Sequence, residues 1–593
     1  MKTWLAFVTA ALVALPCNAQ QAADTHAPEG PGAGRVATSA AVDAAQAAKA
    51  AGRPARADDW MVSAANPHAV AAGARVLRNG GTAADAMVAV QAVLGLVEPQ
   101  SSGLGGGAFL VWHDGETGEM TTLDGRETAP LAATPRLFQD DAGEPLDFFE
   151  AVVGGRSVGV PGTPALMKAA HDRWGRTDWA GLFDDAIGLA EDGFTVSPRL
   201  SGMVAMDALR LSRFAPTRDY FLPDGSLLEV GDTLRNPAYA DTLERLAAEG
   251  PQAIYAGPIA RDIVETVRGA PGNPGLLTEA DLALYKVRER APVCAAYRAY
   301  EICGMGPPSS GGLTVGQIMG MLEPFDLAKL GPDSPRAWRL IGDASRLAFA
   351  DRARYMADSD YVPVPVEGLL DPAYLRKRAR RLESGARLES VAPGEPEFDH
   401  ALNWADNASM ARPSTSHVSI VDGDGNVLSM TTTIENAFGS RLMVRGFLLN
   451  NELTDFSFRS HRDGRPVANR VEPGKRPRSS MAPTIVLRDG KPVLAVGSPG
   501  GSRIIGYVVK ALVAHLDWEM DVQQATATPN LVNRFGPFDV EAGPAANALA
   551  AALADKGYEV RRRAMVSGLH AIALGDALTG GADPRREGVA LGQ

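Results

Sequence analysis

The sequence predicts an α+β fold in which antiparallel strand pairs are covered by helices. Residues 417–433 form one predicted hairpin, because two runs rich in β-branched residues flank an Asp/Gly/Asn turn. A second strand pair is predicted at 108–112 and 120–123. Between residues 159 and 356 the apolar pattern is mainly helical, and we interpret these helices as outer layers. The clearest amphipathic segments are 164–174, 179–190, 239–248 and 336–355.

The N-terminus has the layout of a secretory signal. Lys2 precedes an apolar run from Trp4 to Pro16, and the small residues of Cys17-Asn18-Ala19 follow it. We therefore predict a signal peptide over residues 1–19. Residues 20–56 are Ala/Gly-rich with almost no large apolar side chains, and we expect a flexible leader that cannot order itself.

Two helices are predicted at the start of the folded part. The first covers 68–77, between the start signal Asn66-Pro67 and the stop signal Gly80-Gly81. The second covers 82–97, opens with a capping box and is apolar nearly all round, so it should be buried. The glycine-rich run 103–107 then precedes a strand, the reverse of the order in a dinucleotide-binding loop. We expect no nucleotide site there.

Composition limits the partners. The chain has 593 residues, of which 45% are hydrophobic, so it can form several domains or one large layered domain. Its net charge is -12 and it has no long Lys/Arg run, so nucleic acid is an unexpected partner. No run after the signal reaches the roughly 20 apolar residues of a membrane span. We expect an exported protein, periplasmic or secreted, with no membrane span.

Two cysteines remain after removal of the signal. Cys294 and Cys303 lie symmetrically in a stretch whose composition suits a short hairpin. They can face each other across it and form a disulfide in an oxidising compartment, or they can stay reduced and buried. The sequence leaves both alternatives open.

The predicted nucleophile is Thr415, at the edge of the 417–433 hairpin. A threonine hydroxyl is a poor nucleophile, but a free α-amino group on the same residue, with a pKa near ~8, can act as its base. The α-amino group becomes free only if the Ser414–Thr415 bond is cleaved. A catalytic residue with a free α-amino group is the arrangement found in N-terminal-nucleophile hydrolases. The alternative is a solvated Ser/Thr-rich strand edge. His417 lacks the sequence context of a catalytic triad, and we interpret it as structural.

Several sequence blocks resemble the γ-glutamyltransferase family, in order and at similar spacing. In the C-terminal part these are Thr415–Ser419, Asp424–Asn426, Thr431–Thr433, Asn450–Phe456, Lys475–Thr484 and Gly497–Arg503. Upstream they are Pro99–Gly107, Asp124–Pro130 and Pro307–Gly312.

The resemblance implies a four-layer αββα sandwich and cleavage between Ser414 and Thr415. The products would be a large subunit, residues 57–414 after the leader, and a small subunit, residues 415–593, associated as a heterodimer. It also implies γ-glutamyl donors such as glutathione, with water, amino acids or peptides as acceptors. The nine histidines show no metal-ligand spacing, and we expect neither a metal nor a cofactor.

The resemblance also assigns roles to individual residues. Thr433 would align the nucleophile, and the amides of Gly500 and Gly501 would form the oxyanion hole. Residues that would hold the donor α-carboxylate are Arg126, Ser479 and Ser480. Residues that would hold the α-ammonium are Glu435, Glu452 and Asp455.

Two features differ from the pattern of many relatives. Glu435 and Glu452 are acids where many members carry Asn and Gln, so three carboxylates would surround one ammonium. The lid segment 459–465 is short, charged and without tyrosine. We therefore keep two alternatives to a γ-glutamyltransferase or hydrolase. One is a glutaryl or cephalosporin acylase on the same scaffold, and the other is a non-catalytic exported glutamate-binding protein.

Overall fold

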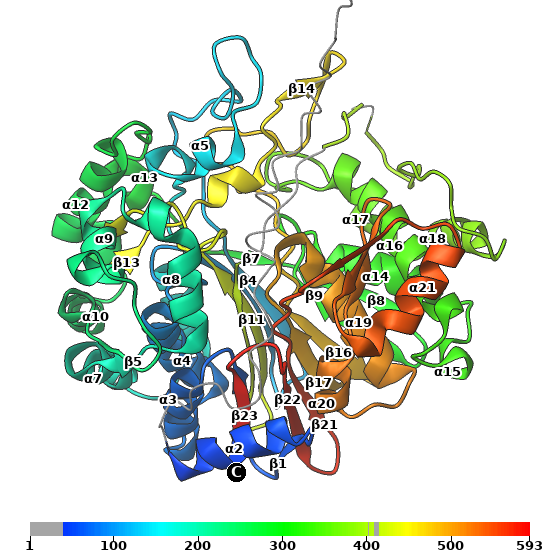
Figure 1. The fold of residues 1–593 in the computed structure, drawn as a ribbon, viewed down its shortest axis with the longest axis horizontal. Coiled ribbons are helices and arrows are strands. Elements are labelled where there is room, and N and C mark those ends of the chain that lie inside the picture. Colours follow the sequence, from blue (N-terminus) through cyan, green and yellow to red (C-terminus); the bar gives the residue numbers. More distant parts are fainter. Residues whose placement is uncertain (1–38, 401–402, 408–413) are drawn as a thin grey trace, which may run out of the picture.

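The computed structural model describes residues 39–400, 403–407 and 414–593 as two stacked seven-stranded sheets between two helical layers (Figure 1). The predicted αββα sandwich is confirmed. Sheet I has the order β23 (Val589–Gly592), β2 (Met61–Ala64), β10 (Ser416–Val421), β11 (Val427–Thr433), β3 (Gly107–His113), β4 (Met120–Gly125), β7 (Arg288–Arg290). Sheet II has the order β1 (Ala55–Ala57), β22 (Leu578–Ala582), β21 (His570–Leu574), β17 (Lys491–Gly497), β16 (Thr484–Arg488), β9 (Tyr300–Gly304), β8 (Val293–Tyr297).

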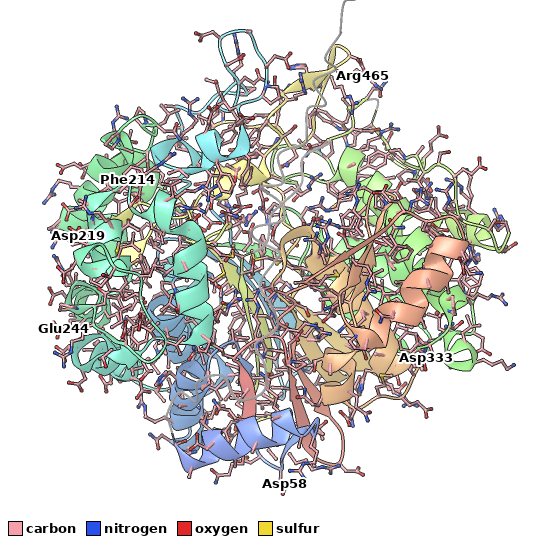
Figure 2. All side chains as sticks on the ribbon, in the orientation of Figure 1. Asp58, Phe214, Asp219, Glu244, Asp333 and Arg465 are labelled. Carbon is pink, nitrogen blue, oxygen red and sulfur yellow. A yellow bond between two sulfur atoms is a disulfide. The ribbon has the colours of Figure 1, made fainter. Side chains whose placement is uncertain are left out.

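The two sheets are held together by the apolar side chains of their facing surfaces. Met61, Val111 and Val427 of sheet I pack against Ile485 and Ile572 of sheet II in one buried cluster. Each such side chain contributes about 1.5–3 kcal/mol when it leaves water. Side chains fill the spaces between the layers throughout (Figure 2). The sandwich therefore gives a rigid base to whatever lies at the strand ends.

Cys294 and Cys303 are directly paired in the antiparallel β8–β9 ladder, and their sulfurs form a disulfide. The structure thus selects the first of the two states that the sequence left open.

One helical layer covers each sheet. Over sheet I it contains α3 (Pro67–Arg78), α4 (Ala83–Val97), α6 (Thr163–Trp174), α7 (Asp184–Asp192), α8 (Pro198–Leu211) and α10 (Pro237–Glu249). Over sheet II it contains α14 (Gly311–Leu322), α16 (Pro335–Tyr355), α18 (Pro372–Ala379), α19 (Ile504–Leu516) and α20 (Val522–Ala527). The capping box at Thr82 and Asp85 is present and α4 is buried along its whole length, as predicted. Within the described ranges, no helix combines the length and apolar content of a membrane span.

Smaller elements complete the layers and the rim. The helices are α5 (Phe148–Val152), α9 (Ala215–Phe221), α11 (Gln252–Tyr255), α12 (Gly257–Arg268), α13 (Glu279–Ala283), α15 (Leu327–Leu330), α17 (Val366–Leu370) and α21 (Asn547–Asp555). The strands are β5 (Phe194–Thr195), β6 (Thr233–Leu234), β12 (Met443–Val444), β13 (Phe447–Leu448), β14 (His461–Arg462), β15 (Arg465–Pro466), β18 (Leu531–Asn533), β19 (Phe538–Glu541) and β20 (Val560–Arg563). The predicted lid segment therefore forms the small β14–β15 hairpin.

The described part of the predicted flexible leader contains an ordered helix, which corrects the expectation for these residues. The predicted signal and the leader up to residue 38 lie outside the described residues. Within the rest, α2 (Ala40–Ala50) is a helix capped by Ser39, and Val42 is buried. Alanine has the best helix propensity, and the Lys49 ammonium donates to the carbonyls of Arg586 and, at 2.6 Å, Gly588. The leader orders because the C-terminal strand region gives it a docking surface.

We predict that Lys49→Met destabilises the folded chain by about 1–3 kcal/mol, because two buried carbonyls lose a charged donor. Guanidinium unfolding monitored by circular dichroism measures this change. Lys329→Met serves as the control, since that side chain is 86% exposed. Equal guanidinium midpoints of unfolding for the two variants would contradict a stabilising contact between α2 and the C-terminal segment.

Candidate active site

The position of Thr415 is set by the pairing of two central strands of sheet I. Thr415 directly precedes β10, and the antiparallel register pairs Ser416 with Thr432. Thr415 is therefore opposite Thr433, the last residue of β11. The two hydroxyl oxygens are 3.4 Å apart. The Thr433 hydroxyl donates to the Ser414 carbonyl at 2.8 Å, and the Thr415 hydroxyl contacts the same carbonyl oxygen. Both hydroxyls thus meet at the bond predicted to be cut.

Three further contacts hold this bond in place. The Ser414 hydroxyl donates to the Gln100 carbonyl at 2.6 Å, and Arg586 donates to the Thr415 carbonyl at 3.1 Å. The Glu435 amide donates to the Thr433 hydroxyl at 2.8 Å. Sequence analysis gave no role to Gln100 or Arg586, because they lie 314 and 171 residues from their partners and belong to no local motif with them.

Gly500 and Gly501 form the turn between β17 and α19, with φ angles of 139° and 57°. Both values lie in the region that favours glycine. A Cβ at Gly500 would stand 2.6 Å from the Tyr507 ring, so a larger residue has no room there. The turn can expose two backbone N–H groups near Thr415, since Gly501 lines the same small pocket as Thr415.

A buried ion cluster lies beside the two threonines. Arg126 follows β4, and its guanidinium group pairs with Glu452 and, at 2.5 Å, with Asp455. Glu127 is next, 3.9 Å from the same guanidinium. All four side chains are buried. The closer partners of Arg126 are therefore the two acids distant in sequence and not its neighbour Glu127.

Burial and mutual repulsion change the acidity of this cluster. Burial raises the pKa of Glu452 to about 8, while its contact with Arg126 opposes the shift. Burial, followed by the charge of Glu452, raises the pKa of Glu127 well above its usual range. Burial alone would lower the pKa of Arg126, but Glu452 and Asp455 raise it. The arginine therefore stays charged, and the acids hold at least one proton at neutral pH.

Nearly all the predicted site residues surround one small pocket of about 20 Å³. Its lining includes Arg126, Ser414, Thr415, Thr433, Glu435, Glu452, Asp455, Ser479, Ser480 and Gly501. Among the predicted residues, Gly500 is the one outside the lining. Thr433 is the last residue of β11 in sheet I, and the other predicted residues come from loops and short helical turns on either side of the predicted cleavage point.

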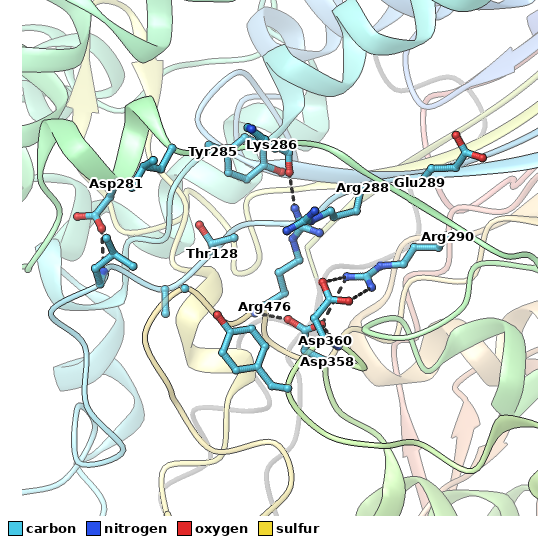
Figure 3. Close-up of a pocket in the computed structure, with 15 residues that line it drawn as sticks. Thr128, Asp281, Tyr285, Lys286, Arg288, Glu289, Arg290, Asp358, Asp360 and Arg476 are labelled. Carbon is cyan, nitrogen blue, oxygen red and sulfur yellow. Dashed lines mark hydrogen bonds and ion pairs between the residues drawn. The ribbon is translucent and has the colours of Figure 1, made fainter.

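The loop that carries Arg126 is supported from its other side. Asp124 accepts the Arg126 amide at 2.9 Å, and its second oxygen accepts from Arg476 at 2.8 Å and Arg290 at 3.0 Å. Figure 3 shows Arg476 and Arg290 in a separate cavity of about 560 Å³. None of the predicted site residues lines this larger cavity. Its charged groups fix the position of the Arg126 loop.

His417 is a structural residue, as interpreted from the sequence. It is buried, and its ring nitrogens bond the hydroxyls of Thr431 at 2.9 Å and Ser419 at 3.1 Å. Burial lowers its pKa to about 3, so the ring is neutral. For metals, the one candidate ligand group in the described part of the chain is Cys294, Glu301 and Cys303. Its two sulfurs are joined in the disulfide and offer no thiolates.

Comparison with known proteins gives consistent results. Residues 69–593 match the sequence family described as Gamma-glutamyltranspeptidase. A glutathione hydrolase proenzyme of Bacillus subtilis is 39% identical over 80% of this chain and 80% of its own length. The Escherichia coli protein of the same name is 36% identical over 90% of this chain and 91% of its own length. The crystal structure of a cephalosporin acylase from Bacillus halodurans superposes with a TM-score of 0.80 at 25% identity, covering 91% of this chain and 97% of that chain.

We predict that Glu452 lowers stability progressively as the pH rises from about 4.5 to about 8, so that the wild-type protein loses stability relative to Glu452→Gln over this range. In this pH range the folded state holds a proton on Glu452 that the unfolded state has already lost. The contribution of Glu452 to the free energy of unfolding therefore falls by at most about 1.4 kcal/mol per pH unit. Thermal unfolding at about pH 5 and about pH 8 measures the slope. Glu472→Gln, at a partly exposed position, is the control. An unchanged slope in Glu452→Gln would contradict the buried protonated carboxyl.

Proposed function

The chain belongs to the γ-glutamyltranspeptidase family, and on that premise we propose that it cuts itself between Ser414 and Thr415 and then uses Thr415 as its nucleophile. It is an enzyme of γ-glutamyl transfer and hydrolysis. The observation that carries the proposal is the meeting of the Thr415 and Thr433 hydroxyls at the Ser414 carbonyl.

Self-cleavage starts with the attack of the Thr415 hydroxyl oxygen on the Ser414 carbonyl carbon. The Thr433 hydroxyl donates to that carbonyl oxygen, which favours the charge that develops on it. The Thr415 hydroxyl proton moves to the peptide nitrogen as the C–N bond breaks, so that an ester to Thr415 forms and the nitrogen becomes a free α-amino group. Water then hydrolyses the ester and leaves a carboxylate on Ser414. Ser414 lines the small pocket, so its departure opens space in front of Thr415.

In turnover the same hydroxyl attacks the γ-carbonyl of the donor. The new α-amino group takes the hydroxyl proton and passes it to the leaving amine, which gives a γ-glutamyl ester on Thr415. Water or an acceptor amine then attacks this ester and releases the product. We assign the oxyanion to the amides of Gly500 and Gly501. One such donor lowers the barrier by about 3 kcal/mol.

Donor recognition needs groups of both charges in the pocket. We assign the α-ammonium to Glu435, Glu452 and Asp455, whose carboxyl groups are all buried at its edge. We assign the α-carboxylate to Arg126, Ser479 and Ser480, which line the same pocket. Glutathione-like donors fit this set, because the γ-glutamyl end carries both charges.

The proposal extends to the mature form and its location. Cleavage would leave a large subunit, with residues 57–414 following the leader, and a small subunit, residues 415–593. Strands β10 and β11 of the small subunit lie between β2 and β3 of the large one, so the two would remain associated as a heterodimer. The predicted signal supports a periplasmic or secreted protein. Acceptors would be water, amino acids or peptides.

We predict that Thr415→Ala remains one uncut chain without activity on γ-glutamyl anilide, because the attacking oxygen is lost. Gel electrophoresis of purified protein and an anilide assay measure both effects. Ser416→Ala, whose hydroxyl bonds Glu98 at 3.1 Å instead, is the matched control and should still be cut. Two subunits in Thr415→Ala would overturn the mechanism. A wild-type chain that stays whole and binds L-glutamate without turnover would instead favour the binding-protein alternative.

The second candidate is a glutaryl or cephalosporin acylase, which the close superposition on a cephalosporin acylase favours. A glutaryl group has the terminal carboxylate but lacks the ammonium. Glu435, Glu452 and Asp455 would then have no positive group of the substrate to bind. These buried acids favour the γ-glutamyl donor.

We predict that kcat/KM on γ-glutamyl anilide exceeds that on glutaryl anilide by about 10- to 100-fold, the value of a charged hydrogen bond. Glu435→Gln should narrow this ratio, because one charged acceptor of the ammonium is lost. Parallel anilide assays measure both values. A preference for the glutaryl compound would establish the acylase.

A further inference from the structure

Arg352, near the end of α16, reaches the two serines of the donor pocket from behind. Its Nη2 donates to the Ser480 hydroxyl at 2.6 Å, and its Nε donates to the Ser310 hydroxyl at 2.7 Å. The Ser310 hydroxyl in turn donates to the Ser479 carbonyl at 2.5 Å. One guanidinium group therefore fixes the Ser479-Ser480 segment through two routes. Arg352 does not line the pocket and was not among the predicted site residues.

These bonds determine what the two serine hydroxyls can offer to a ligand. The Ser480 oxygen accepts from Arg352, and the Ser479 oxygen accepts from the Met481 amide at 3.1 Å. In the described part of the chain neither hydroxyl donates to a protein acceptor. A serine hydroxyl has one proton to donate, and both serines line the pocket. Two O–H donors are thus available for an anion.

The distribution of buried charge around these serines also favours binding of an anion. The Arg126 guanidinium is already in contact with Glu452 and Asp455. Arg352 and its neighbour Arg478 are 4% and 3% exposed, and within the described ranges no carboxylate oxygen lies within ion-pair distance of either. Burial and the charge of Arg478 lower the pKa of Arg352, and burial lowers that of Arg478 to about 10, while Asp455, beyond ion-pair distance, opposes both shifts. Buried charges without a close partner are costly, which favours binding of an anion beside them.

Arg126 has little donor capacity left for a ligand. A guanidinium group has five N–H bonds. Four of them are used in contacts with Glu452, Asp455, Pro477 and Arg478. The remaining one lies on the side of Glu127.

We infer that Arg352, backed by Arg478, supplies the positive charge that selects donors with a free α-carboxylate, and that it acts through the Ser480 hydroxyl. This inference rests on the proposed function and refines its donor site. Arg126 keeps its place in the α-carboxylate site, and Arg352 adds a second positive charge behind Ser480. Arg352 is a positioning residue, because it touches Ser480 and not the donor.

The test uses three anilides that differ at one carbon of the acyl group. The γ-glutamyl compound has carboxylate and ammonium, the glutaryl compound has the carboxylate alone, and the 4-aminobutyryl compound has the ammonium alone. In Arg352→Met, kcat/KM should fall by about 10- to 100-fold on the two carboxylate compounds, mainly through KM. It should stay unchanged on the 4-aminobutyryl compound. Arg352→Lys should recover part of the loss, since it keeps the charge but not the two-pronged contact.

Arg354→Met is the matched control. It lies on the same helix and pairs with the partly exposed Asp406 at 2.8 Å, so it should leave all three rates unchanged. A second readout does not need turnover. The thermal unfolding midpoint of the wild-type protein should rise more with L-glutamate than with 4-aminobutyrate. Arg352→Met should lose this difference. The midpoint of Arg352→Met without ligand reports any loss of stability.

The outcomes separate this inference from the proposed function. An equal loss on all three anilides, or full retention of the L-glutamate shift in Arg352→Met, would overturn the role of Arg352 while the γ-glutamyl activity stands. A wild-type protein without anilide turnover, whose L-glutamate shift depends on Arg352, would support the inference and overturn the proposed function. Equal shifts with the two ligands in the wild type would overturn the inference in either case.

Discussion

The register between β10 and β11 is the constraint on which the site depends. Strand side chains alternate, so a slip of one residue would turn the Thr433 hydroxyl to the opposite face of the sheet. Pairing with β2 on one side and β11 on the other fixes β10 against such a slip. Because both neighbours are themselves buried, the hydroxyls of Thr415 and Thr433 meet at the Ser414 carbonyl without any flexible element. A fold that fixes this register also fixes the bond to be cut.

A second constraint is the balance of buried charge. The site contains more ionisable groups than a low-dielectric interior tolerates unless each has a partner or a proton. Arg126 meets this requirement by its contacts with Glu452 and Asp455, and Glu127 and Glu452, whose pKa values burial raises, meet it by holding protons. Arg352 and Arg478 do not meet it through the described carboxylates. The excess positive charge therefore lies beside Ser480, where an incoming anion would neutralise it.

The predictable part of the structure is the part encoded locally. The 417–433 hairpin, the capping box of α4 and the αββα layering follow from short patterns or from family motifs, and the motif residues do gather around one pocket. Arg352 was missed because an arginine in the last turn of an amphipathic helix looks like ordinary solvated charge. The α2 helix was missed because its stability comes from Lys49 and a docking surface more than 500 residues away. Such long-range contacts leave no periodicity for a single sequence to show.

A zwitterionic acyl group suits the pocket better than an anion alone. A donor with both charges brings a cation to the acids that line the pocket and an anion to the serines. A glutaryl group would satisfy the serines but would place an uncharged methylene beside Glu435 and Asp455. These acids keep their protein contacts, Asn451 for Glu435 and Arg126 for Asp455, but the methylene would desolvate them further without adding a positive charge, which costs free energy that binding must supply. The charge pattern, more than the shape of the fold that acylases share, therefore selects the γ-glutamyl group.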